Sequence, residues 1–319
     1  MDILRILNLE PKGYSATARA VLQQLGVISE GPLTRDELMR AVAEVDVLVV
    51  RLGHAIDRAI IESSRTLRVI VSATTGLDHI DVEAARERGI TVLSLQGETE
   101  FLRTVHATAE HTWALLLSLR RRVVPAALSV RRGEWDRDRF TGRELNGARL
   151  GILGLGRIGG KVAGYGLAFG MQVSAYDPYV QEWPEGISRA ESLPDLLSES
   201  DVLSIHIPLN EETSNLLNAE RLALLPSGAV LVNTSRGEII DENALADALE
   251  QGRLGGAALD TVCNERDATL RTSGRLMAVA PDADYLLTTP HIGGATQESM
   301  AKTELFMARK LARFLQDHN

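Results

Sequence analysis

Short apolar runs alternate with longer helical stretches along the first third of the chain. Four runs are predicted as strands: Ile3–Leu9, Val45–Arg51, Leu67–Ser72 and Ile90–Leu93. Helical segments lie between them at Arg35–Ala43 and Val82–Arg88. Strands that alternate with helices predict parallel βαβ units. Runs such as VDVLVV and LRVIVSA are apolar on both faces, which is typical of strands buried from both sides.

A second series of the same kind begins at Arg149. Its predicted strands are Arg149–Leu153, Gln172–Tyr176, Val202–His206, Val230–Asn233, Gly256–Leu259 and Tyr285–Thr288. Between the two series, residues 97–122 are predicted to form a loop that runs into a long helix, and Glu298–Phe314 is predicted as a second amphipathic helix. Two strand–helix series favour two α/β domains.

The composition narrows the possible partners and locations. The chain has 319 residues, 45% of them hydrophobic, which is enough for two cores. Its formal net charge of −9 disfavours nonspecific binding to nucleic acid or to anionic membranes. The longest apolar run, Trp113–Leu119, is too short to span a bilayer. The N-terminal residues lack signal-peptide features, and the single Cys263 cannot form an intrachain disulfide, so we expect a cytoplasmic protein.

A glycine motif follows the first strand of the second series. The segment RLGILGLGRIG places Gly154, Gly156 and Gly159 at the start of a helix over Gly160–Phe169. Gly154 permits a tight turn, Gly156 allows the backbone to approach a pyrophosphate, and Gly159 lets helix and strand pack closely. The N–H groups at the helix N-terminus favour phosphate. The alternative is a glycine-rich turn without a ligand. The position of the motif between a predicted strand and a predicted helix favours a dinucleotide site.

Asp177 ends the next predicted strand, about 20 residues after the motif, where dinucleotide folds carry their ribose-binding acid. Its carboxylate would accept hydrogen bonds from the adenosine ribose and repel a 2′-phosphate. The sequence therefore predicts NAD as the cofactor in preference to NADP. A surface charge without a ligand is the alternative for Asp177.

Three later segments carry a family resemblance. They are Val232–Asp241 (VNTSRGEIID), Leu259–Glu265 (LDTVCNE) and Thr289–Thr296 (TPHIGGAT), and residues 75–81 (TGLDHID) extend the pattern. Together with the glycine motif, this ordered set resembles the D-isomer specific 2-hydroxyacid dehydrogenase family, in its phosphoglycerate dehydrogenase-like form. The resemblance runs from about Val45 to Ser299.

The resemblance implies three catalytic residues. Arg236 would bind the substrate carboxylate and carbonyl oxygen, His291 would protonate the forming alkoxide, and Glu265 would hold the imidazole. Hydride transfer to a ketone also requires these residue types, independently of the resemblance. A fixed cation stabilises the negative charge that forms on the oxygen, and His donates protons near neutral pH. Taken singly, each could be structural. In much of the family a proline follows the glutamate, whereas here Arg266 follows Glu265.

The motif and the resemblance together imply a set of cofactor-binding residues. His206 follows a strand end, and a structural role for it is an equal alternative. The set is Thr108, Gly154, Gly156, Arg157, Ile158, Gly159, Asp177, Pro178, His206, Pro208, Thr234 and Asp260.

The substrate-binding residues implied by the resemblance are Thr75 and Gly76, whose backbone N–H groups would bind a carboxylate, and Arg236. Arg51 matches a position that faces a charged substrate tail in phosphoglycerate-type members, with a solvated strand-end arginine as the alternative. Residues 94–110 are about five residues longer than in many relatives. We expect Arg103 and His106 in this loop to help define the substrate tail, the alternative being a solvent loop.

The expected architecture is α/β, with two doubly wound parallel-sheet domains: a Rossmann NAD-binding domain over residues 98–290 inserted in a flavodoxin-like substrate domain over 1–97 and 291–319. The implied activity transfers a hydride between NAD(H) and a small 2-oxo or 2-hydroxy acid; an anionic tail (phosphate, phosphonate or carboxylate) is compatible with the sequence but not required by it. No metal site is expected. Family resemblance implies a homodimer in which Trp135 is a candidate interface residue, with a core position as the equal alternative. A non-catalytic NAD-sensing scaffold of corepressor type is the alternative; an adenosyl-homocysteine hydrolase and a formate dehydrogenase fit the motifs less well.

Overall fold

The computed structural model describes residues 3–279 and 284–318. The chain divides into two compact units: unit 1 comprises residues 1–105 and 295–319, and unit 2 comprises residues 106–294. The predicted boundaries fell eight and four residues earlier (97 against 105, and 290 against 294). This division places His291 in unit 2, where its backbone N–H donates to the Asp260 carbonyl at 2.8 Å.

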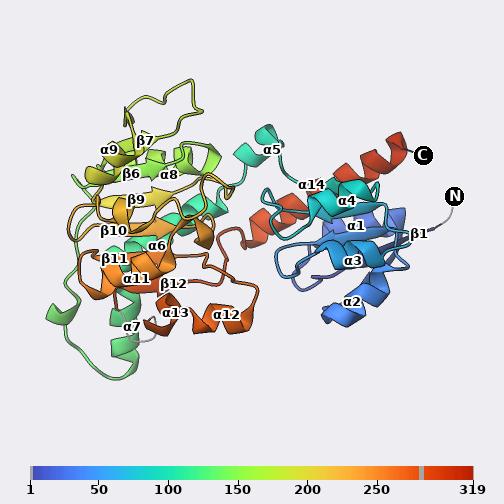
Figure 1. The fold of residues 1–319 in the computed structure, drawn as a ribbon, viewed down its shortest axis with the longest axis horizontal. Helices are drawn as coiled ribbons and strands as arrows, with labels where there is room; N and C mark the ends of the chain where they lie inside the picture. The colour runs from blue at the N-terminus through green and yellow to red at the C-terminus, as the bar shows by residue number, and fades with distance from the viewer. Residues whose placement is uncertain (1–2, 280–283, 319) are drawn as a thin grey trace. The chain divides into compact units, whose positions relative to one another are not determined.

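Unit 1 is built on a five-stranded parallel sheet with the strand order β2-β1-β3-β4-β5. This order is the flavodoxin-like one. The strands are β1 (Leu4–Asn8), β2 (Gly26–Glu30), β3 (Val47–Val50), β4 (Val69–Ser72) and β5 (Thr91–Leu93). The helices are α1 (Ala16–Leu25), α2 (Arg35–Val42), α3 (Arg58–Ser63), α4 (Val82–Glu87), α5 (Thr99–Arg103) and α14 (Gln297–Asp317) (Figure 1).

The alternation of side chains along β3 explains why unit 1 has a core on each face of its sheet. Val47 and Val49 belong to the cluster packed with α1 and α14, whereas Leu48 and Val50 belong to the cluster packed with α2, α3 and α4. All four side chains are buried. A strand covered on both faces must be apolar at every position, and the VLVV run meets that requirement.

Unit 2 is built on a seven-stranded parallel sheet with the strand order β12-β11-β10-β9-β6-β7-β8, which is the Rossmann order extended by one strand. The strands are β6 (Arg149–Leu153), β7 (Gln172–Tyr176), β8 (Ser188–Arg189), β9 (Val202–Ile205), β10 (Val230–Asn233), β11 (Gly256–Leu259) and β12 (Leu286–Thr288). The helices are α6 (Ala107–Arg120), α7 (Val123–Arg131), α8 (Arg157–Ala168), α9 (Leu193–Ser198), α10 (Ala219–Leu222), α11 (Glu242–Glu250), α12 (Ala268–Ser273) and α13 (Arg275–Val279), with 3₁₀ turns at Asp138–Phe140 and Gly237–Ile239.

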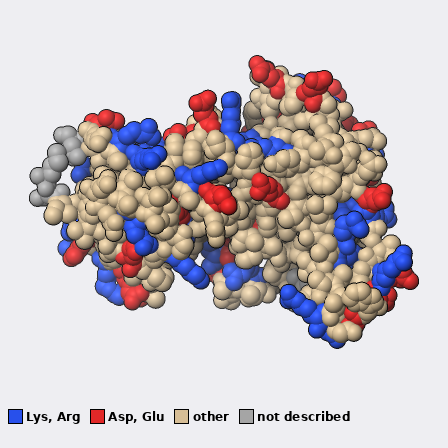
Figure 2. Space-filling model, turned by 180° about the vertical axis from the view of Figure 1, so that it is seen from behind, with Lys and Arg blue, Asp and Glu red and all other residues tan. Residues whose placement is uncertain are grey.

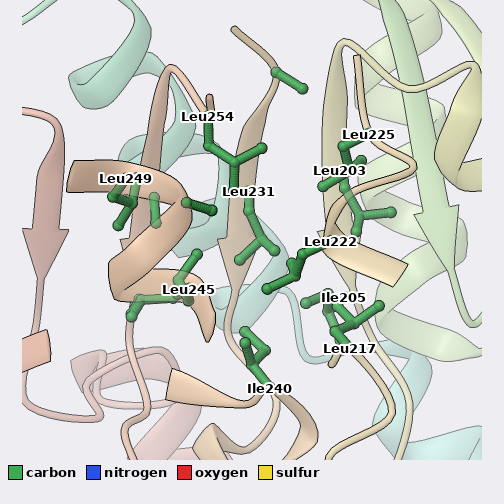
Figure 3. Packing of buried hydrophobic residues seen from close by; sticks show 14 of the residues in the cluster. Leu203, Ile205, Leu217, Leu222, Leu225, Leu231, Ile240, Leu245, Leu249 and Leu254 are labelled. Carbon is green, nitrogen blue, oxygen red and sulfur yellow. The ribbon is translucent and has the colours of Figure 1, made fainter. Parts of the chain in front are cut away.

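The sheet of unit 2 also separates two cores. On one face, Leu203 of β9 and Leu231 of β10 pack against leucines of α10 and α11, whose side chains converge in Figure 3. On the other face, Val230 and Val232 of β10 pack with Trp113 of α6. This alternation repeats the arrangement in unit 1. The predicted class, two doubly wound parallel α/β domains, is confirmed.

The sequence prediction missed two strands and merged two helices. The edge strands β2 and β8 were not predicted, because neither is an apolar run. Residues 97–122, predicted as a loop and one long helix, contain α5 and α6 separated by residues 104–106. The last residues of the stretch end the helix, since Arg122 has a left-handed backbone with φ +53°.

The charges are spread over the surface. On the face shown in Figure 2, the basic and acidic side chains of the described residues are interspersed. An anion that binds on this face must therefore be held by particular side chains and backbone N–H groups. Every helix in the described ranges is too short or too polar to span a lipid bilayer.

Candidate functional site

The predicted catalytic and cofactor residues of unit 2 gather at one edge of its sheet. Gly154 follows β6, Asp177 follows β7, and His206 follows β9. Thr234 and Arg236 follow β10, Asp260 follows β11, and His291 is the third residue after β12. Because all seven strands are parallel, their carboxyl ends meet at this edge, where ligands bind in open α/β sheets.

The glycine motif forms a tight turn between β6 and α8. Gly154 has φ +91°, and its N–H donates to the Tyr176 carbonyl at 3.0 Å. A Cβ at Gly154 would lie 2.9 Å from the backbone of His206, and a Cβ at Gly159 would overlap the Gly154 carbonyl oxygen. Both positions therefore need glycine, which brings α8 close to the sheet.

The N-terminus of α8 is open and positively charged. The space beside Gly156, the N-cap residue, is empty within 4 Å among the described atoms. Arg157 begins the helix, and burial lowers the pKa of its guanidinium. Over residues 3–279 and 284–318, no carboxylate pairs with Arg157. Ile158 follows it, half-buried, on the first turn. An uncompensated cation at a helix N-terminus suits a phosphate group.

Asp177 accepts hydrogen bonds from backbone N–H groups in and near the glycine turn. Its Oδ2 accepts the Leu155 N–H at 2.8 Å, and its Oδ1 accepts the Tyr179 N–H at 2.9 Å. Leu155 lies between the first two motif glycines, so Asp177 fixes the backbone of the turn. A carboxylate can accept about four hydrogen bonds, so it retains capacity for ribose hydroxyls. Pro178 beside it is exposed.

His206 lies next to the turn, on the loop after β9. Its backbone N–H donates to the Leu153 carbonyl at 2.8 Å, and its Nε2 lies 2.8 Å from the Ser204 hydroxyl. Burial lowers the pKa of His206 to about 3, so the ring is neutral at physiological pH. Pro208, two residues on, is exposed, and its carbonyl accepts the Thr213 hydroxyl at 2.7 Å.

Arg236 is held by the residues that end β10. The Asn233 side-chain amide donates to the Arg236 carbonyl at 2.8 Å, and its oxygen accepts the Ser235 N–H at 2.9 Å. The Ser235 hydroxyl donates to the Ile205 carbonyl at 2.9 Å. The half-buried Arg236 donates from Nη1 to the Ser235 carbonyl at 2.7 Å. These hydrogen bonds at the polar end of the VNTSR segment therefore hold the Arg236 guanidinium in a fixed position.

Two residues that sequence reasoning missed join the Arg236 loop to the Glu265 loop. A Cβ at Gly237 would overlap the backbone of Val262 and Cys263, so glycine allows these two segments to touch. Glu242, at the start of α11, accepts the Cys263 N–H at 2.7 Å. Burial raises the pKa of the Glu242 carboxyl. The GEIIDE segment offered no sequence signal for these contacts.

The structure brings His291 and Glu265 together. The His291 Nδ1 lies 2.7 Å from the Glu265 Oε1, and both side chains are about one-fifth exposed, at 19% and 20%. His291 has a left-handed backbone with φ +53°. Arg266, in place of the usual proline, does not prevent this contact. The Nδ1 contact leaves Nε2 as the nitrogen that can exchange a proton with a substrate.

Asp260 organises the segment that carries His291. Its Oδ1 accepts the Thr289 hydroxyl at 2.6 Å and the Ile292 N–H at 2.9 Å, while its Oδ2 accepts the Gly293 N–H at 2.7 Å. Asp260 is 1% exposed. Burial acts to raise the pKa of this carboxyl, but the hydrogen bonds that it accepts hold the pKa below its ordinary value.

Helix α6 reaches the same edge through its first turns. The His111 Nε2 lies 3.1 Å from the Asp260 Oδ1 and 3.0 Å from the Thr289 hydroxyl. Thr234, a predicted cofactor residue, lies 2.9 Å from Thr112 between hydroxyl oxygens. Thr108, another predicted cofactor residue, lies beside Gly293. A Cβ built on Gly293 would lie 3.3 Å from the Thr108 methyl carbon. Sequence reasoning missed His111 and Thr112.

In unit 1, the turn after β4 carries Thr75 and Gly76. Thr75 is exposed, and the Thr74 hydroxyl donates to the Gly76 carbonyl at 2.8 Å. The Leu95 N–H donates to the Thr74 carbonyl at 3.0 Å, which ties the segment after β5 to this turn. These two hydrogen bonds hold the backbone of the turn in place.

Arg51, predicted to face a substrate tail, is engaged inside unit 1. Its Nη1 lies 3.3 Å from the Glu304 Oε1 of α14, and its Nη2 donates to the carbonyls of Glu10 and Lys12 at 3.1 Å. Its Nε lies 3.5 Å from the Glu10 carboxylate. These contacts describe a guanidinium that joins β3, the loop after β1 and α14.

The loop after β5 is folded onto α14. Phe101 of α5 stacks on Phe306 with ring centroids 4.0 Å apart, and Leu102 is buried. Lys310 donates to the Ser94 carbonyl at 2.9 Å and to Glu98 at 2.6 Å. The segment is therefore a packed element of unit 1. Exposed Arg103 ends α5.

His106 belongs to the other unit. Its Nδ1 lies 3.2 Å from the Lys161 Nζ and 3.4 Å from the Tyr165 hydroxyl of α8. The two residues proposed to act together in the long loop, Arg103 and His106, therefore fall on either side of the boundary between the units.

No group of three or more metal-ligating side chains occurs over residues 3–279 and 284–318.

A parallel Rossmann sheet with a glycine turn, an arginine and a Glu–His pair at one edge is an arrangement of nucleotide-dependent dehydrogenases. Residues 113–293 match the family model described as D-isomer specific 2-hydroxyacid dehydrogenase, NAD binding domain. The chain belongs to the D-isomer specific 2-hydroxyacid dehydrogenase family.

Named relatives agree with this membership. A hydroxypyruvate reductase of Thermotoga maritima is 37% identical over 293 residues, which cover 92% of each chain. A D-3-phosphoglycerate dehydrogenase of Methanocaldococcus jannaschii is 37% identical over 98% of this chain, which spans only 58% of that relative's length.

Solved structures share the fold over nearly the whole chain. The TT0316 protein of Thermus thermophilus is 34% identical, with a TM-score of 0.85 over 98% of this chain and 97% of its own. A D-lactate dehydrogenase of Aquifex aeolicus, solved with NAD and lactic acid, is 27% identical, with a TM-score of 0.84 over 98% of this chain and 96% of its own.

Proposed function

We propose that this protein is an NAD-dependent oxidoreductase that interconverts a small 2-oxo acid and its 2-hydroxy acid. The observation that carries the proposal is the Glu265–His291 pair, joined at 2.7 Å at the sheet edge that also holds Arg236 and the glycine turn. The relatives named above, a phosphoglycerate dehydrogenase, a hydroxypyruvate reductase and a D-lactate dehydrogenase, support this reaction class.

The residues around the glycine turn fit NAD. Gly154 and Gly159 shape the turn, the space beside Gly156 is open among the described atoms, and Arg157, which pairs with no carboxylate in that part of the chain, supplies a cation for the pyrophosphate. Asp177 supplies carboxylate oxygens for the ribose hydroxyls and would repel a 2′-phosphate. We assign Ile158, Pro178, His206, Pro208, Thr234, Asp260 and Thr108 to the surroundings of the same cofactor. When bound, the nicotinamide supplies or accepts the hydride.

The remaining chemistry belongs to this chain's own side chains. Arg236 holds the substrate carboxylate and carbonyl oxygen through a planar guanidinium, which stabilises the negative charge that develops on that oxygen. His291 donates a proton from Nε2 to this oxygen during reduction and accepts it back during oxidation. Glu265, on Nδ1, fixes the ring orientation and stabilises the imidazolium.

In unit 1, we assign the substrate carboxylate to the backbone N–H groups of Thr75 and Gly76, and an anionic substrate tail to Arg103. The packing of α5 on α14 supports this role for Arg103, because it fixes the exposed arginine on a folded element. Arg51 enters the proposal as a support for the β3 end, since its guanidinium is engaged with Glu10 and Glu304.

The test is NADH consumption across 2-oxo acids with neutral, carboxylated, phosphorylated and phosphonylated tails. We expect turnover to be fastest with one of the anionic tails. Arg103→Ala should then raise KM for that acid without changing KM for a neutral one. Arg68→Ala, on an exposed arginine before β4, is the matched control. No turnover with any acid, while NADH still binds, would contradict the proposal and favour a non-catalytic NAD-binding scaffold.

We also propose a homodimer. The supporting observation is a set of exposed apolar side chains on α7 and the segment after it. Trp135 is 88% exposed, and the others are Val123, Val124, Leu128 and Val130. Large apolar side chains gathered on one exposed segment are typical of an interaction surface. The cytoplasmic location and the absence of nucleic-acid binding stay predictions.

A further inference from the structure

Helix α6 supplies a buried polar contact that the proposed reaction does not itself use. His111 lies on its second turn, with a side chain 17% exposed, and its Nε2 faces both the Asp260 Oδ1 at 3.1 Å and the Thr289 hydroxyl at 3.0 Å. Thr289 in turn donates to the same carboxylate oxygen at 2.6 Å. The His111 Nε2, the Thr289 hydroxyl and the Asp260 Oδ1 are therefore each within hydrogen-bond distance of the other two.

The Asp260 carboxylate holds the backbone on both sides of the proposed proton donor. The Thr289 hydroxyl donates to it from two residues before His291, and the Ile292 and Gly293 N–H groups donate to it from the residues after. The Asp260 backbone carbonyl accepts the His291 N–H at 2.8 Å. Asp260 therefore binds the segment 289–293 at four points.

The segment needs such an anchor, because His291 adopts a conformation that a non-glycine residue rarely occupies. Its φ of +53° lies in the left-handed region, which is unfavourable for an L-residue with a Cβ. Such conformations persist where the surroundings over-determine them. The bonds to Asp260 supply that constraint, and they set the direction in which the His291 ring leaves the backbone.

We propose that His111 is a positioning residue that acts through Asp260 on His291. By donating from Nε2 to the Asp260 carboxylate, the imidazole keeps this carboxylate turned toward the segment 289–293 and compensates its burial. Asp260 is 1% exposed, so losing one donor leaves a buried oxygen less well satisfied and free to turn. His291 would then leave its aligned position, although no residue that touches substrate has changed.

The geometry sets what each substitution should do. His111→Leu removes the donor, whereas His111→Gln keeps an N–H donor at a similar reach. We expect His111→Leu to lower kcat about tenfold or more, because small misplacements of a reacting group carry large rate costs. His111→Gln should recover most of that loss. KM for the 2-oxo acid should stay within about twofold, since proton transfer rather than substrate binding is affected.

The readout that a merely structural role would not move is the behaviour of His291 itself. In His111→Leu, the amide hydrogens of Ile292 and Gly293 should exchange faster, and the ring of His291 should titrate at a different pH in a histidine NMR experiment. His318→Leu, which replaces an exposed histidine at the end of α14, is the matched control and should change neither.

This inference rests on the proposed function for its kinetic arm only. If the unsubstituted protein turns over no 2-oxo acid, the proposed function fails, and the exchange and titration measurements still test the anchoring. If kcat, amide exchange and the His291 titration are all unchanged in a folded His111→Leu variant, His111 has no positioning role. A loss that His111→Gln does not recover would also overturn the proposal, because the donor would then be irrelevant.

Discussion

At the scale of single residues, Asp177 has two roles, one in the glycine turn and one in the proposed preference for NAD. It accepts backbone N–H groups that shape the glycine turn, and in the proposed function its negative charge repels a 2′-phosphate. The first role needs an oxygen acceptor, whereas the second needs the charge. The isosteric change Asp177→Asn removes the charge and keeps one of the two oxygen acceptors, so it tests the charge while giving up only one hydrogen bond to the turn.

We predict that Asp177→Asn lowers the preference for NADH over NADPH, measured as the ratio of kcat/KM values, by about tenfold or more, which corresponds to about 1.4 kcal/mol. Asp195→Asn, on α9 of the same unit, should leave this ratio unchanged. A retained ratio in Asp177→Asn would assign the preference to another residue.

His206 gives the folded protein a pH dependence with a definite sign. Burial lowers the pKa of this ring from 6.5 to about 3, so below pH 6.5 the unfolded chain binds a proton that the folded chain does not. The stability that His206 contributes is present above pH 6.5 and is lost as the pH falls toward 3. The free energy of unfolding should fall by up to about 1.4 kcal/mol per pH unit in this window.

The measurement is urea unfolding between pH 7 and pH 4, made for the unsubstituted protein and for His206→Asn, which does not titrate. The slope of stability against pH should be smaller in His206→Asn. Equal slopes in the two proteins would mean that His206 is protonated in the folded state as readily as in the unfolded chain. His318→Asn, at an exposed position, serves as the control.

At the scale of elements, α8 contains glycines with opposite requirements. A Cβ at Gly159 would overlap the Gly154 carbonyl, whereas the space around Gly164 is open within 4 Å among the described atoms. Both lie in the same helix, so helix propensity favours alanine equally at each. Only the contact with the turn distinguishes them.

Gly159→Ala should therefore destabilise the protein by about 1–3 kcal/mol and weaken NADH binding, because the helix must move away from the turn. Gly164→Ala should stabilise it by about 0.5–1 kcal/mol without a change in NADH affinity. Urea unfolding and NADH fluorescence titration check both variants. Equal effects of the two substitutions would show that α8 does not depend on close contact with the turn.

The elements also show what sequence patterns can and cannot predict. The central strands were predicted because they are buried on both faces, and β6, β7, β10 and β11 have the predicted bounds. The edge strand β2 was missed because its side chains are half-buried or exposed. The helix α5 was missed because five residues with two charges carry no period, and its packing depends on Phe306 far along the chain.

The site divides in the same way. Arg236, Glu265 and His291 could be proposed because each stands in a local motif after a strand. The bond between His111 and Asp260 joins residues 149 apart, and that between Arg51 and Glu304 joins residues 253 apart. Asp260 and Arg51 were named from the sequence, but the neighbours of His111 and Glu304 in the sequence carry no motif that marks them as the partners. Contacts of this kind depend on how helices pack on the sheet, which a single sequence does not specify.

At the scale of the whole molecule, the proposed dimer makes a prediction about α7 and the segment after it. Removing a large exposed aromatic side chain from an interface should weaken association strongly, because a few such residues carry most of the binding energy. We predict that Trp135→Ser raises the dimer dissociation constant about tenfold or more, measured by sedimentation.

Val27→Ser is the matched control, since Val27 is 63% exposed on the edge strand β2 of the other unit. It should leave the dissociation constant unchanged. Sedimentation of the unsubstituted protein as a monomer at micromolar concentration would contradict the proposed dimer. The exposed apolar residues of α7 would then need another explanation.

The contact at Gly237 has a consequence for how this chain can change. Because the missing side chain lets the Arg236 loop rest on the peptide of Val262 and Cys263, a displacement of either loop is passed to the other. Substitutions in the two loops should then be epistatic, so that their combined effect differs from the sum of the separate ones. A chain that acquires a new substrate by altering one loop will need a compensating replacement in its neighbour.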